Sequence, residues 1–475
     1  MKVAIIGAGP AGITAGYQLA KENIEVHIYE ASNSVGGLAK TVNLWEQKVD
    51  IGPHRFFSND TRVNKLWLEV VGKDYQMVNR LTRILYGKKF YNYPLKPLNA
   101  LFNLGLIEAS NCIISFLLQK CFFQFIQKKE NTFESWVTNR FGKRLFQIFF
   151  KAYSEKLWGI SCKDLDSDFA AQRIKKLSLF EAVFSAIFAG RAKRHKTLVD
   201  QFAYPNGGTG MVYERMADYI SKNNGTVDLN SPVENILVEN GRCIGIKTSN
   251  NIEIKYDHVV STMPINKLSS GIKNIPAYLI KHINNLKFRN TILVFIEVDA
   301  KDLFDDNWLY IHSPEVKTGR ITNFRNWIPE INQNKDTTIL SLEYWCNEND
   351  DLWTLDNEKI IEIAKKDLEI SNLIGENKIL KGHIHKISKC YPIYETGYKK
   401  NLKPLEEYLD NIQNLSVIGR YGSFKYNNQD HSILMGILSA ENISIGKDNN
   451  LWQVNTDYEY QESSRITETG LEISK

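Results

Sequence analysis

The amino-terminal residues have the types and spacing of a dinucleotide-binding turn. Residues 3–12 read VAIIGAGPAG, in which Gly7, Gly9 and Gly12 fit the pattern G-x-G-x-x-G after a short apolar run. A second apolar run follows and ends on Glu30. In this pattern the first glycine allows a tight turn, the second lets a pyrophosphate approach bare backbone, and the third lets a helix pack on the strand. The helix N-terminus would face the phosphates and Glu30 would accept hydrogen bonds from a ribose diol, so we expect a dinucleotide-binding unit.

A second strand-and-glycine unit occurs late in the chain. Residues 415–419 read LSVIG, an apolar strand that ends in Gly419, and a helix with one apolar face follows. This unit would return the chain to the nucleotide-binding sheet, where Gly419 would lie near the cofactor. Arg420 comes directly after it, so its guanidinium is expected beside the cofactor or the substrate.

Patterns for other kinds of catalysis are missing from the sequence. It contains no G-x-S-x-G, no H-E-x-x-H, no P-loop and no cluster with metal-ligand spacing. The six cysteines are widely spaced and form no C-x-x-C pair, which favours reduced thiols over disulfides or zinc. We therefore expect no metal, and chemistry that depends on a bound organic cofactor.

The elements that must position these residues follow from periodicity. At 475 residues the chain exceeds one hydrophobic core, so several domains are expected. Helical spacing dominates residues 76–200, whereas residues 290–299 and 337–346 are rich in β-branched and aromatic residues and predict a second sheet. The fold class is α/β, with a Rossmann-like cofactor domain interleaved with a mixed-sheet substrate domain and a helical insertion. The expected parts are cofactor domain 1–75, 205–270 and 386–446, helical cap 76–204, substrate sheet 271–385 and polar extension 447–475.

Composition limits the partners. Apolar residues make up 43% and charged residues 24%, as in ordinary globular proteins, and the net charge is +5. No block of five like charges occurs, so nucleic-acid binding is not expected. No apolar run reaches the roughly 18 residues of a membrane span. The nearest, residues 112–126, is interrupted by Gln119 and Lys120 and predicts a buried or amphipathic helix, with peripheral membrane contact as the alternative.

A second glycine pair indicates which dinucleotide binds. Gly36 and Gly37 follow shortly after Glu30. This arrangement resembles FAD-binding flavoproteins rather than NAD dehydrogenases, and the resemblance implies an FAD-binding domain of the GR2 type. From the residues alone, the pair requires only a close approach of the backbone or a turn with positive φ.

Three further blocks resemble the UDP-galactopyranose mutase family, within the amine oxidase and protoporphyrinogen oxidase superfamily of flavoproteins. They are residues 52–56 (GPHRF), residues 149–159 (FFKAYSEKLWG) and residues 419–420 (GR) leading into 424–430 (FKYNNQD). The likeness covers roughly residues 1–446. It implies a cytoplasmic FAD enzyme of surface-polysaccharide synthesis that isomerises a nucleotide sugar between pyranose and furanose through N5 of reduced flavin, with NADPH as the reductant.

The resemblance also implies roles for individual residues. Arg173 and Arg320 match diphosphate anchors, although Arg173 requires a one-residue shift in spacing. His54 lies in the turn that passes the flavin ring in that family, where it could hydrogen-bond the flavin. The remaining matched residues would contact substrate: Tyr153 and Trp158 by stacking, Tyr426 at the phosphates, and Asn428 where the family usually has an acidic residue. The alternatives are a surface or salt-bridge role for Arg173 and Arg320, core packing for Tyr153 and Trp158, and a structural role for His54.

The departures keep a second function open. The triplet after the histidine differs from the usual mutase triplet, and the chain is longer than typical bacterial mutases. Apolar helices expected at 101–126 and 177–189 could instead line a channel for a lipophilic substrate of an amine oxidase or protoporphyrinogen oxidase type of oxidoreductase. The nucleotide, the sugar and the oligomeric state do not follow from the sequence.

Overall fold

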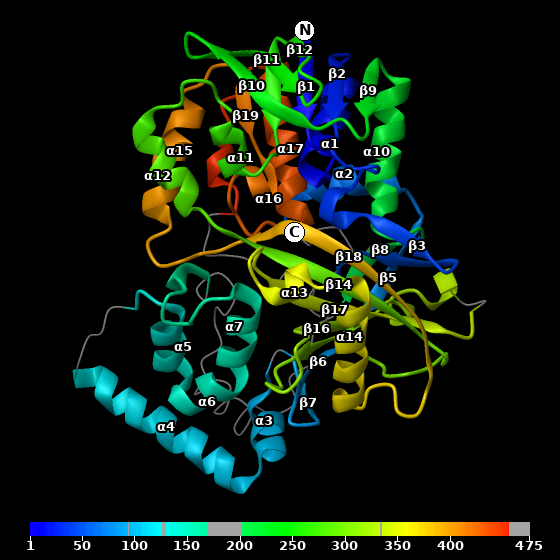
Figure 1. The fold of residues 1–475 in the computed structure, drawn as a ribbon, viewed down its shortest axis with the longest axis vertical. Coiled ribbons are helices and arrows are strands. Elements are labelled where there is room, and N and C mark those ends of the chain that lie inside the picture. The colour runs from blue at the N-terminus through cyan, green and yellow to red at the C-terminus, as the bar shows by residue number, and fades with distance from the viewer. Residues whose placement is uncertain (94, 126–129, 170–200, 333–334, 456–475) are drawn as a thin grey trace.

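A computed structural model gives the fold of the chain and describes all residues except 94, 126–129, 170–200, 333–334 and 456–475. Figure 1 shows two sheet-centred halves, one with the amino terminus and a parallel sheet, the other with a larger mixed sheet and a group of helices at its far end. The chain crosses between the halves several times.

The first half is built on a five-stranded parallel sheet with the order β19-β13-β1-β2-β9. Its strands are short and their apolar side chains are buried on both faces, as expected where helices cover a parallel sheet. The strands are β1 (Lys2–Ile6), β2 (Glu25–Tyr29), β9 (Gly225–Asp228), β13 (His258–Ser261) and β19 (Leu415–Val417). The apolar runs predicted before Gly7, before Glu30 and before Gly419 correspond to β1, β2 and β19.

Helices pack closely on this sheet. Helix α1 (Pro10–Lys21) contacts both α10 (Gly210–Lys222) and α17 (Gln429–Ser444). A Cβ atom on Gly436 would lie 2.6 Å from the carbonyl oxygen of Ala11, so a glycine is required where α17 crosses α1. The late helix is thereby fixed against the first one, as the strand-and-glycine unit predicted.

Smaller elements complete this half of the molecule. An antiparallel three-stranded sheet, order β10-β11-β12, leads into β13. The other elements here are β3 (Thr41–Leu44), β4 (Gln47–Asp50), β5 (Tyr75–Asn79), β8 (Gln201–Pro205), β10 (Val233–Glu239), β11 (Arg242–Thr248), β12 (Glu253–Lys255), α2 (Thr61–Val71), α11 (Ile265–Ser270), α12 (Ala277–Asn285), α15 (Lys399–Asp410) and α16 (Gly419–Gly422).

The second half contains a seven-stranded mixed sheet with the order β18-β14-β17-β16-β15-β6-β7. Its two central strands are β14 (Phe288–Val298) and β17 (Thr338–Cys346), which confirms the predicted second sheet. The other strands and the covering helices are β6 (Thr82–Tyr86), β7 (Lys89–Asn92), β15 (Trp308–Ile311), β16 (Arg320–Asn323), β18 (Ile379–Pro392), α13 (Asp351–Thr354) and α14 (Asn357–Ser371).

The prediction of a mostly helical segment from residue 76 was wrong at its start. Strand β6 pairs in parallel with β15, and β7 pairs with β6, so residues 82–92 extend the large sheet. These short strands have little period-2 alternation of their own, and their pairing with a distant strand determines their conformation.

The helical group follows β7. It consists of α3 (Pro97–Leu104), α4 (Leu106–Phe125), α5 (Phe133–Phe141), α6 (Lys143–Phe146), the five-residue π-helical turn Gln147–Lys151 and α7 (Ala152–Trp158). The helices expected over 98–126 and 133–157 are thus confirmed. The helix expected over 177–189 lies outside the described residues.

The carboxyl-terminal segment was predicted to be a polar surface extension from residue 447. Up to residue 455 the structure contradicts this, because Leu451, Trp452 and Val454 are buried. The ammonium group of Lys425 donates hydrogen bonds to the carbonyl oxygens of Trp452 and Val454, which ties this segment to the loop before α17. Most residues of this segment are polar, so its composition gave no sign that these three apolar side chains are buried.

Candidate active site

A cavity of about 940 Å³ lies where the carboxyl ends of four parallel strands meet the second half of the molecule. Its wall includes Gly7 after β1, Glu30 after β2, Thr262 after β13 and Gly419 after β19. Ligands of open α/β sheets bind at this edge, because the strand ends and helix N-termini present unpaired backbone groups there. The far wall is supplied by β15, β16 and α7 of the second half.

The first glycine motif forms a tight turn, in which a side chain at Gly7 or at Gly12 would collide with neighbouring atoms. Gly7 has φ +98°, and a Cβ atom on it would lie 2.2 Å from Oγ1 of Thr262. A Cβ on Gly12 would lie 2.0 Å from the carbonyl oxygen of Gly7, so this glycine lets α1 pack on the turn. Gly9 precedes the first residue of α1 and faces the cavity, together with Pro10 and Ala11.

The second glycine pair contacts the first motif directly. The amide of Gly36 donates a 2.8 Å hydrogen bond to the carbonyl of Ala8, and a Cβ on Gly37 would lie 2.9 Å from Cα of Gly9. Glu30 accepts hydrogen bonds of 2.8 Å from the backbone amides of Ala8 and Ser32. Gly7, Gly9, Glu30 and Gly37 therefore line the cavity, whereas Gly12 and Gly36 support its wall from behind.

His54 enters the cavity from a rigid turn. Its carbonyl oxygen accepts hydrogen bonds from Oγ1 of Thr209 at 3.0 Å and from Nε2 of Gln429 at 3.1 Å. Burial, together with the positive charges of Arg320 and Arg420, lowers the pKa of its imidazole to about 3. The ring is therefore neutral at physiological pH. Its Nδ1 is buried and has no hydrogen-bond partner among the described residues.

Arg420 lies in the cavity wall between two aromatic rings. Its guanidinium carbon is 4.6 Å from the ring centre of Tyr391 and 4.4 Å from that of Tyr426. Its Nε donates to the carbonyl of Cys390 at 2.9 Å and its Nη1 to the carbonyl of Asn427 at 3.0 Å. No ion pair joins it to a carboxylate within the described part of the chain, so its charge is available to an anion in the cavity.

Arg320 also lines the cavity but has a carboxylate partner. Arg320 on β16 and Glu343 on β17 are directly opposite in the sheet. The guanidinium donates two hydrogen bonds to Glu343, from Nε at 2.6 Å and from Nη2 at 2.5 Å. The Arg320 side chain is 14% exposed and that of Glu343 only 2%, so this bidentate pair is held out of water and fixes the orientation of the guanidinium.

Helix α7 presents one of its two predicted aromatic residues to the cavity. Tyr153 stacks on His312 at 4.8 Å and meets Tyr310 edge to face at 5.6 Å. Trp158 is fully buried, 4.7 Å from Phe169, and does not form part of the cavity wall. Its five-residue separation from Tyr153 places it on another side of the helix, against the core.

The end of α7 is fixed by a buried arginine. Gly159 has φ +66°, and a Cβ on it would lie 2.3 Å from Cζ of Arg289. Arg289 donates to the carbonyl oxygens of Lys156 and Leu157 in the last turn of α7. The glycine that ends the FFKAYSEKLWG block thus admits a guanidinium to the helix terminus, where orphan carbonyls need donors.

The other residues predicted from the sequence are distributed as follows. Tyr426 and Asn428 both line the cavity, and Asn428 also begins α17 as its N-cap, with its amide donating to Nδ1 of His431 at 3.2 Å. Arg173 lies outside the described residues, so the second predicted diphosphate anchor has no described position.

Several cavity residues were not identified from the sequence. Trp308 and Tyr310 on β15 and His312 directly after it all line the cavity, a period-2 signal that could have been recognised. Glu343 is the one carboxylate in the apolar run TILSLEYWC of β17, and a buried carboxylate requires a partner. No group of three His, Cys, Asp or Glu side chains able to hold a metal ion occurs within the described ranges.

Comparison with protein families gives one match that spans most of the chain. Residues 10–443 match the family described as flavin containing amine oxidoreductase. Coproporphyrinogen III oxidase from Staphylococcus aureus is 21% identical over 93% of this chain and 98% of its own length. The chain spans about half the length of two other relatives. They are a 4,4'-diapophytoene desaturase from Methylomonas (20% identical, 54% of this chain, 52% of the relative) and a probable UDP-galactopyranose mutase from Klebsiella pneumoniae (24%, 40% and 50%).

Solved structures share the whole architecture. The structure of a reduced UDP-galactopyranose mutase superimposes with a TM-score of 0.84 at 21% identity, covering 96% of this chain and 97% of that one. A putative protoporphyrinogen oxidase from Exiguobacterium gives 0.72 at 17% identity, with coverages of 94% and 99%. At these identities the likeness establishes the fold: a parallel sheet joined to a large mixed sheet.

Proposed function

This chain belongs to the family of flavin-containing amine oxidoreductases, and we propose that within this family it isomerises a nucleotide-activated sugar between its pyranose and furanose forms. The proposal includes FAD as the flavin, in its reduced state during turnover, and NADPH as a reductant. It also includes a role in surface-polysaccharide synthesis in the cytoplasm. All six cysteines are free thiols, which supports a reducing compartment.

The residues of the cavity fit FAD at both ends. Backbone at Gly9 and Gly37 leaves room for a pyrophosphate beside the N-terminus of α1, and the carboxylate of Glu30 lies where a ribose diol would bind. At the opposite end, the unpartnered Nδ1 of His54 offers a hydrogen bond to a polar edge of the flavin ring. The cradle of glycines and the orphaned imidazole nitrogen would both be explained by the same bound group.

The observation that carries the proposal is that two guanidinium groups, those of Arg320 and Arg420, line the same cavity as His54. The charges of Arg320 and Arg420 act together on His54, in addition to its burial, to lower its pKa to about 3. A field that disfavours an added positive charge favours a negative one, and guanidinium groups match phosphate oxygens bidentately. A diphosphate bound there would lie among aromatic rings able to stack on a nucleobase.

The protein's own groups would perform positioning and exclusion of water. Reduced flavin, when bound, supplies a nucleophilic N5 atom. Arg420, fixed by the carbonyls of Cys390 and Asn427, would hold the departing diphosphate near the sugar, so that it remains available for the return step. Tyr153, Tyr310 and His312 form an apolar wall that keeps water from the reacting carbon. His54 stays neutral and can accept or donate one hydrogen bond at a flavin edge.

A binding test and an activity test address the proposal. UDP is titrated into the purified FAD-containing protein, and we expect a saturable change in the flavin absorbance spectrum. Dithionite-reduced protein is then incubated with UDP-galactofuranose and with other nucleotide sugars, and the products are separated by chromatography. Conversion supports the proposal. A protein that neither binds UDP nor converts any of these sugars would refute it.

A matched pair of arginine variants identifies the anion site. Arg420→Met keeps an apolar stem between the two tyrosines but removes the charge, and we expect UDP affinity to fall at least ten-fold. The control is Arg62→Met, because Arg62 is 49% exposed at the start of α2, away from the cavity wall. Equal UDP affinity in both variants would contradict the assignment of Arg420.

An oxidoreductase is the second candidate, favoured by the full-length match to a coproporphyrinogen oxidase. A porphyrinogen carries carboxylates that the same arginines could bind, and aromatic walls suit its macrocycle. Incubation of the oxidised protein with coproporphyrinogen III in air would then generate fluorescent porphyrin and consume oxygen. An increase in porphyrin fluorescence, without isomerisation of any nucleotide sugar, would favour the oxidoreductase over the isomerase.

A further inference from the structure

Helix α4 is oriented opposite to the usual surface helix. Three of its polar residues, beside the buried Cys112 and Phe116, are bonded to the protein. Glu108 pairs with Arg144 at 2.7 Å, and Oγ of Ser115 accepts a hydrogen bond from the backbone amide of Arg144 at 3.1 Å. Gln119 donates from Nε2 to Oδ1 of Asn139 on α5 at 2.9 Å. A helix on the surface of a globular protein normally places such residues toward water.

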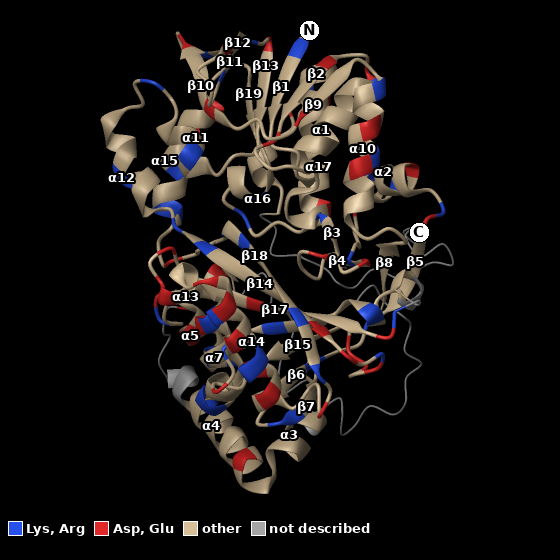
Figure 2. Cartoon of the chain, turned by 45° about the vertical axis from the view of Figure 1, so that its right-hand side comes forward, with Lys and Arg blue, Asp and Glu red and all other residues tan. Residues whose placement is uncertain are grey.

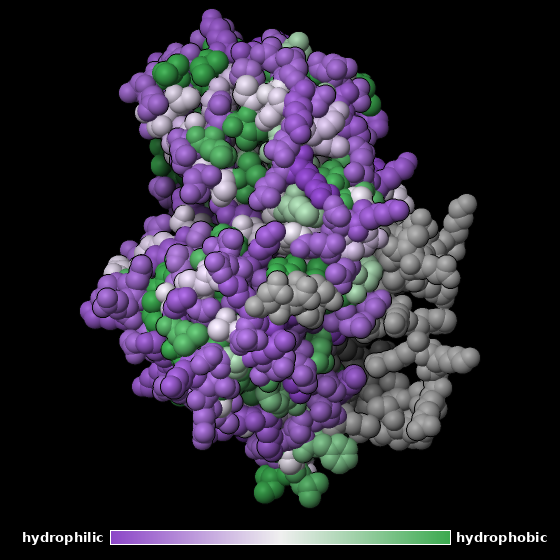
Figure 3. All heavy atoms as spheres, turned by 90° about the vertical axis from the view of Figure 1, so that its right-hand side faces the viewer, coloured by the Kyte–Doolittle hydropathy of each residue, from purple (hydrophilic) through white to green (hydrophobic). Residues whose placement is uncertain are grey.

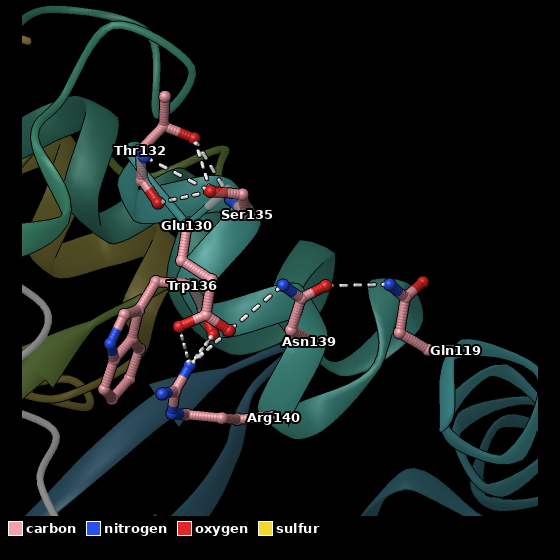
Figure 4. Close-up of polar contacts among 7 residues, drawn as sticks. All are labelled: Gln119, Glu130, Thr132, Ser135, Trp136, Asn139 and Arg140. Carbon is pink, nitrogen blue, oxygen red and sulfur yellow. Dashed lines mark hydrogen bonds and ion pairs between the residues drawn. The ribbon is translucent and has the colours of Figure 1, made fainter. Parts of the chain in front are cut away.

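A polar network fixes this orientation of α4 (Figure 4). Asn139, which receives the hydrogen bond from Gln119, donates in turn to Glu130 at 3.1 Å. Arg140 donates two hydrogen bonds from Nη1 to the Glu130 carboxylate, at 2.9 and 2.8 Å, and its guanidinium covers the ring of Trp136 at 3.9 Å. Because α4 is attached through its polar side, rotation of the helix to bury its apolar side would break these contacts.

The apolar side of α4 faces solvent. The exposed side chains recur at helical spacing, and with one residue of α3 they form what we call the α3–α4 face: Phe102 (82% exposed), Leu106 (89%), Ile107 (79%), Ile113 (46%), Ile114 (55%), Leu117 (54%) and Leu118 (56%). Together they expose on the order of 800 Å² of apolar surface, more than the few hundred that soluble monomers usually show.

The face occupies one extremity of the molecule. Figure 1 shows α4 along the outer edge of the helical group, far from the parallel sheet, and Figure 2 shows few charged residues along its ribbon. In the space-filling view, hydrophobic atoms project at this end of the molecule (Figure 3). An outlying ridge of this kind can meet an extended surface without obstruction by the rest of the chain.

Four exposed lysines lie on the elements of the α3–α4 face or next to them. Lys96 precedes α3, Lys120 is on α4, Lys143 begins α6, which contacts α4, and Lys88 precedes β7, which contacts α3. The nearby carboxylates of Glu108 and Glu130 are already paired with Arg144 and Arg140, whereas no ion pair joins the four lysines to a carboxylate within the described ranges. The rim of the face therefore carries an excess of positive charge.

We propose that the α3–α4 face lies on the surface of an anionic lipid bilayer, with its apolar side chains among the acyl chains and its lysines at the headgroups. Apolar residues on one side of a helix with lysines around them are the pattern of interfacial helices. Among the described residues, no helix is both long and apolar enough to cross a membrane, so α4 would lie along the surface. Two copies of this chain packed through the same face would bring two positively charged rims together. Their repulsion disfavours a second copy as the partner of this face.

The α3–α4 face is joined to the cavity wall by a short stretch of chain. Tyr93 lines the cavity and lies only a few residues before α3 in the chain. The inference concerns where the protein acts and does not depend on which reaction it catalyses.

The test is co-sedimentation of the full-length flavoprotein with vesicles of phosphatidylcholine alone or with 30% phosphatidylserine added. We expect binding to the anionic vesicles, and at least ten-fold weaker binding to the neutral ones and at high salt. The double variant Ile114→Ser, Leu117→Ser should reduce binding to anionic vesicles at least ten-fold. The matched control is Ile252→Ser, Ile280→Ser, at isoleucines 56% and 49% exposed elsewhere, which should bind as the wild type does.

The same preparations separate the alternatives. Analytical ultracentrifugation without lipid reports the oligomeric state, and flavin absorbance with UDP titration reports an intact cavity. A wild-type dimer that the Ile114→Ser, Leu117→Ser variant converts to monomers, with no vesicle binding by either, would assign the face to a second copy and overturn the proposal. Absence of both vesicle binding and dimerisation would overturn it as well.

Discussion

Replacement of Glu343 by glutamine should weaken the fold yet strengthen anion binding. The bidentate pair with Arg320 is buried, with side chains 2% and 14% exposed, and removal of one partner of a buried pair costs about 3–5 kcal/mol. Glutamine still accepts one of the two hydrogen bonds, so we expect a loss of about 3 kcal/mol, at the lower end of that range. If the chain unfolds as one unit, its melting temperature should fall by about 3 °C.

The effect on UDP has the opposite sign. A carboxylate roughly 8 Å from a bound phosphate, at an effective dielectric constant of about 40, opposes binding by about 1 kcal/mol. Glu343→Gln removes that charge while Arg320 remains, so UDP affinity should rise about five-fold. Isothermal titration calorimetry measures the affinity and differential scanning calorimetry the stability. UDP affinity that is unchanged or weaker in this variant would refute the idea that Arg320 faces the anion, even if stability falls as expected.

Three further substitutions test other parts of the structure. Gly37→Ala should lower FAD affinity at least ten-fold because its Cβ would meet backbone at 2.9 Å; Gly375→Ala, at nearly the same φ but with open space, should leave it unchanged in a flavin-release assay. Burial raises the pKa of Asp50 to about 6 from 3.8, so the folded state holds this proton to higher pH than the unfolded state and its stabilising effect is lost as pH rises from about 4 to 6. In denaturant titrations, the unfolding free energy of the wild type should therefore fall by about 3 kcal/mol relative to that of Asp50→Asn across this pH interval. Equal pH dependence of the two unfolding free energies would contradict this. Gly159→Ala should cost about 3 kcal/mol or more because its Cβ would lie 2.3 Å from Cζ of Arg289, and a smaller loss would show that the guanidinium can move aside.

The glycine-lined wall of the cavity could be predicted from the sequence because local rules determine it. Gly7, Gly12 and Gly37 each occupy a position where a Cβ would collide with neighbouring atoms, so the backbone itself requires their residue type. Strand runs such as residues 3–6 are buried on both faces and read as continuous apolar segments. Such signals are present in a single chain without any knowledge of its partners in space.

The opposite wall of the cavity depended on pairing between distant strands. Arg320 could be singled out, but its partner Glu343 became evident only when β16 and β17 were placed side by side. Strands β6 and β7 were missed for the same reason, since β15 lies more than two hundred residues away. Trp158 had the correct residue type for stacking on a ligand, but the direction of its ring depends on how α7 packs against Phe169.

The parallel sheet carries a consequence for biosynthesis. Its five strands come from residues 2–417, and β19, which completes one edge, leaves the ribosome after nearly nine-tenths of the chain has been translated. Gly419 then closes the cavity wall beside Thr262. Strand β1 stays unpaired on one side until β13 has been synthesised, and β13 stays so until β19 has been, and contacts so distant in sequence form slowly. The cavity wall is therefore completed late in folding, and a ligand that needs both Gly7 and Gly419 can bind only after β19 has joined the sheet.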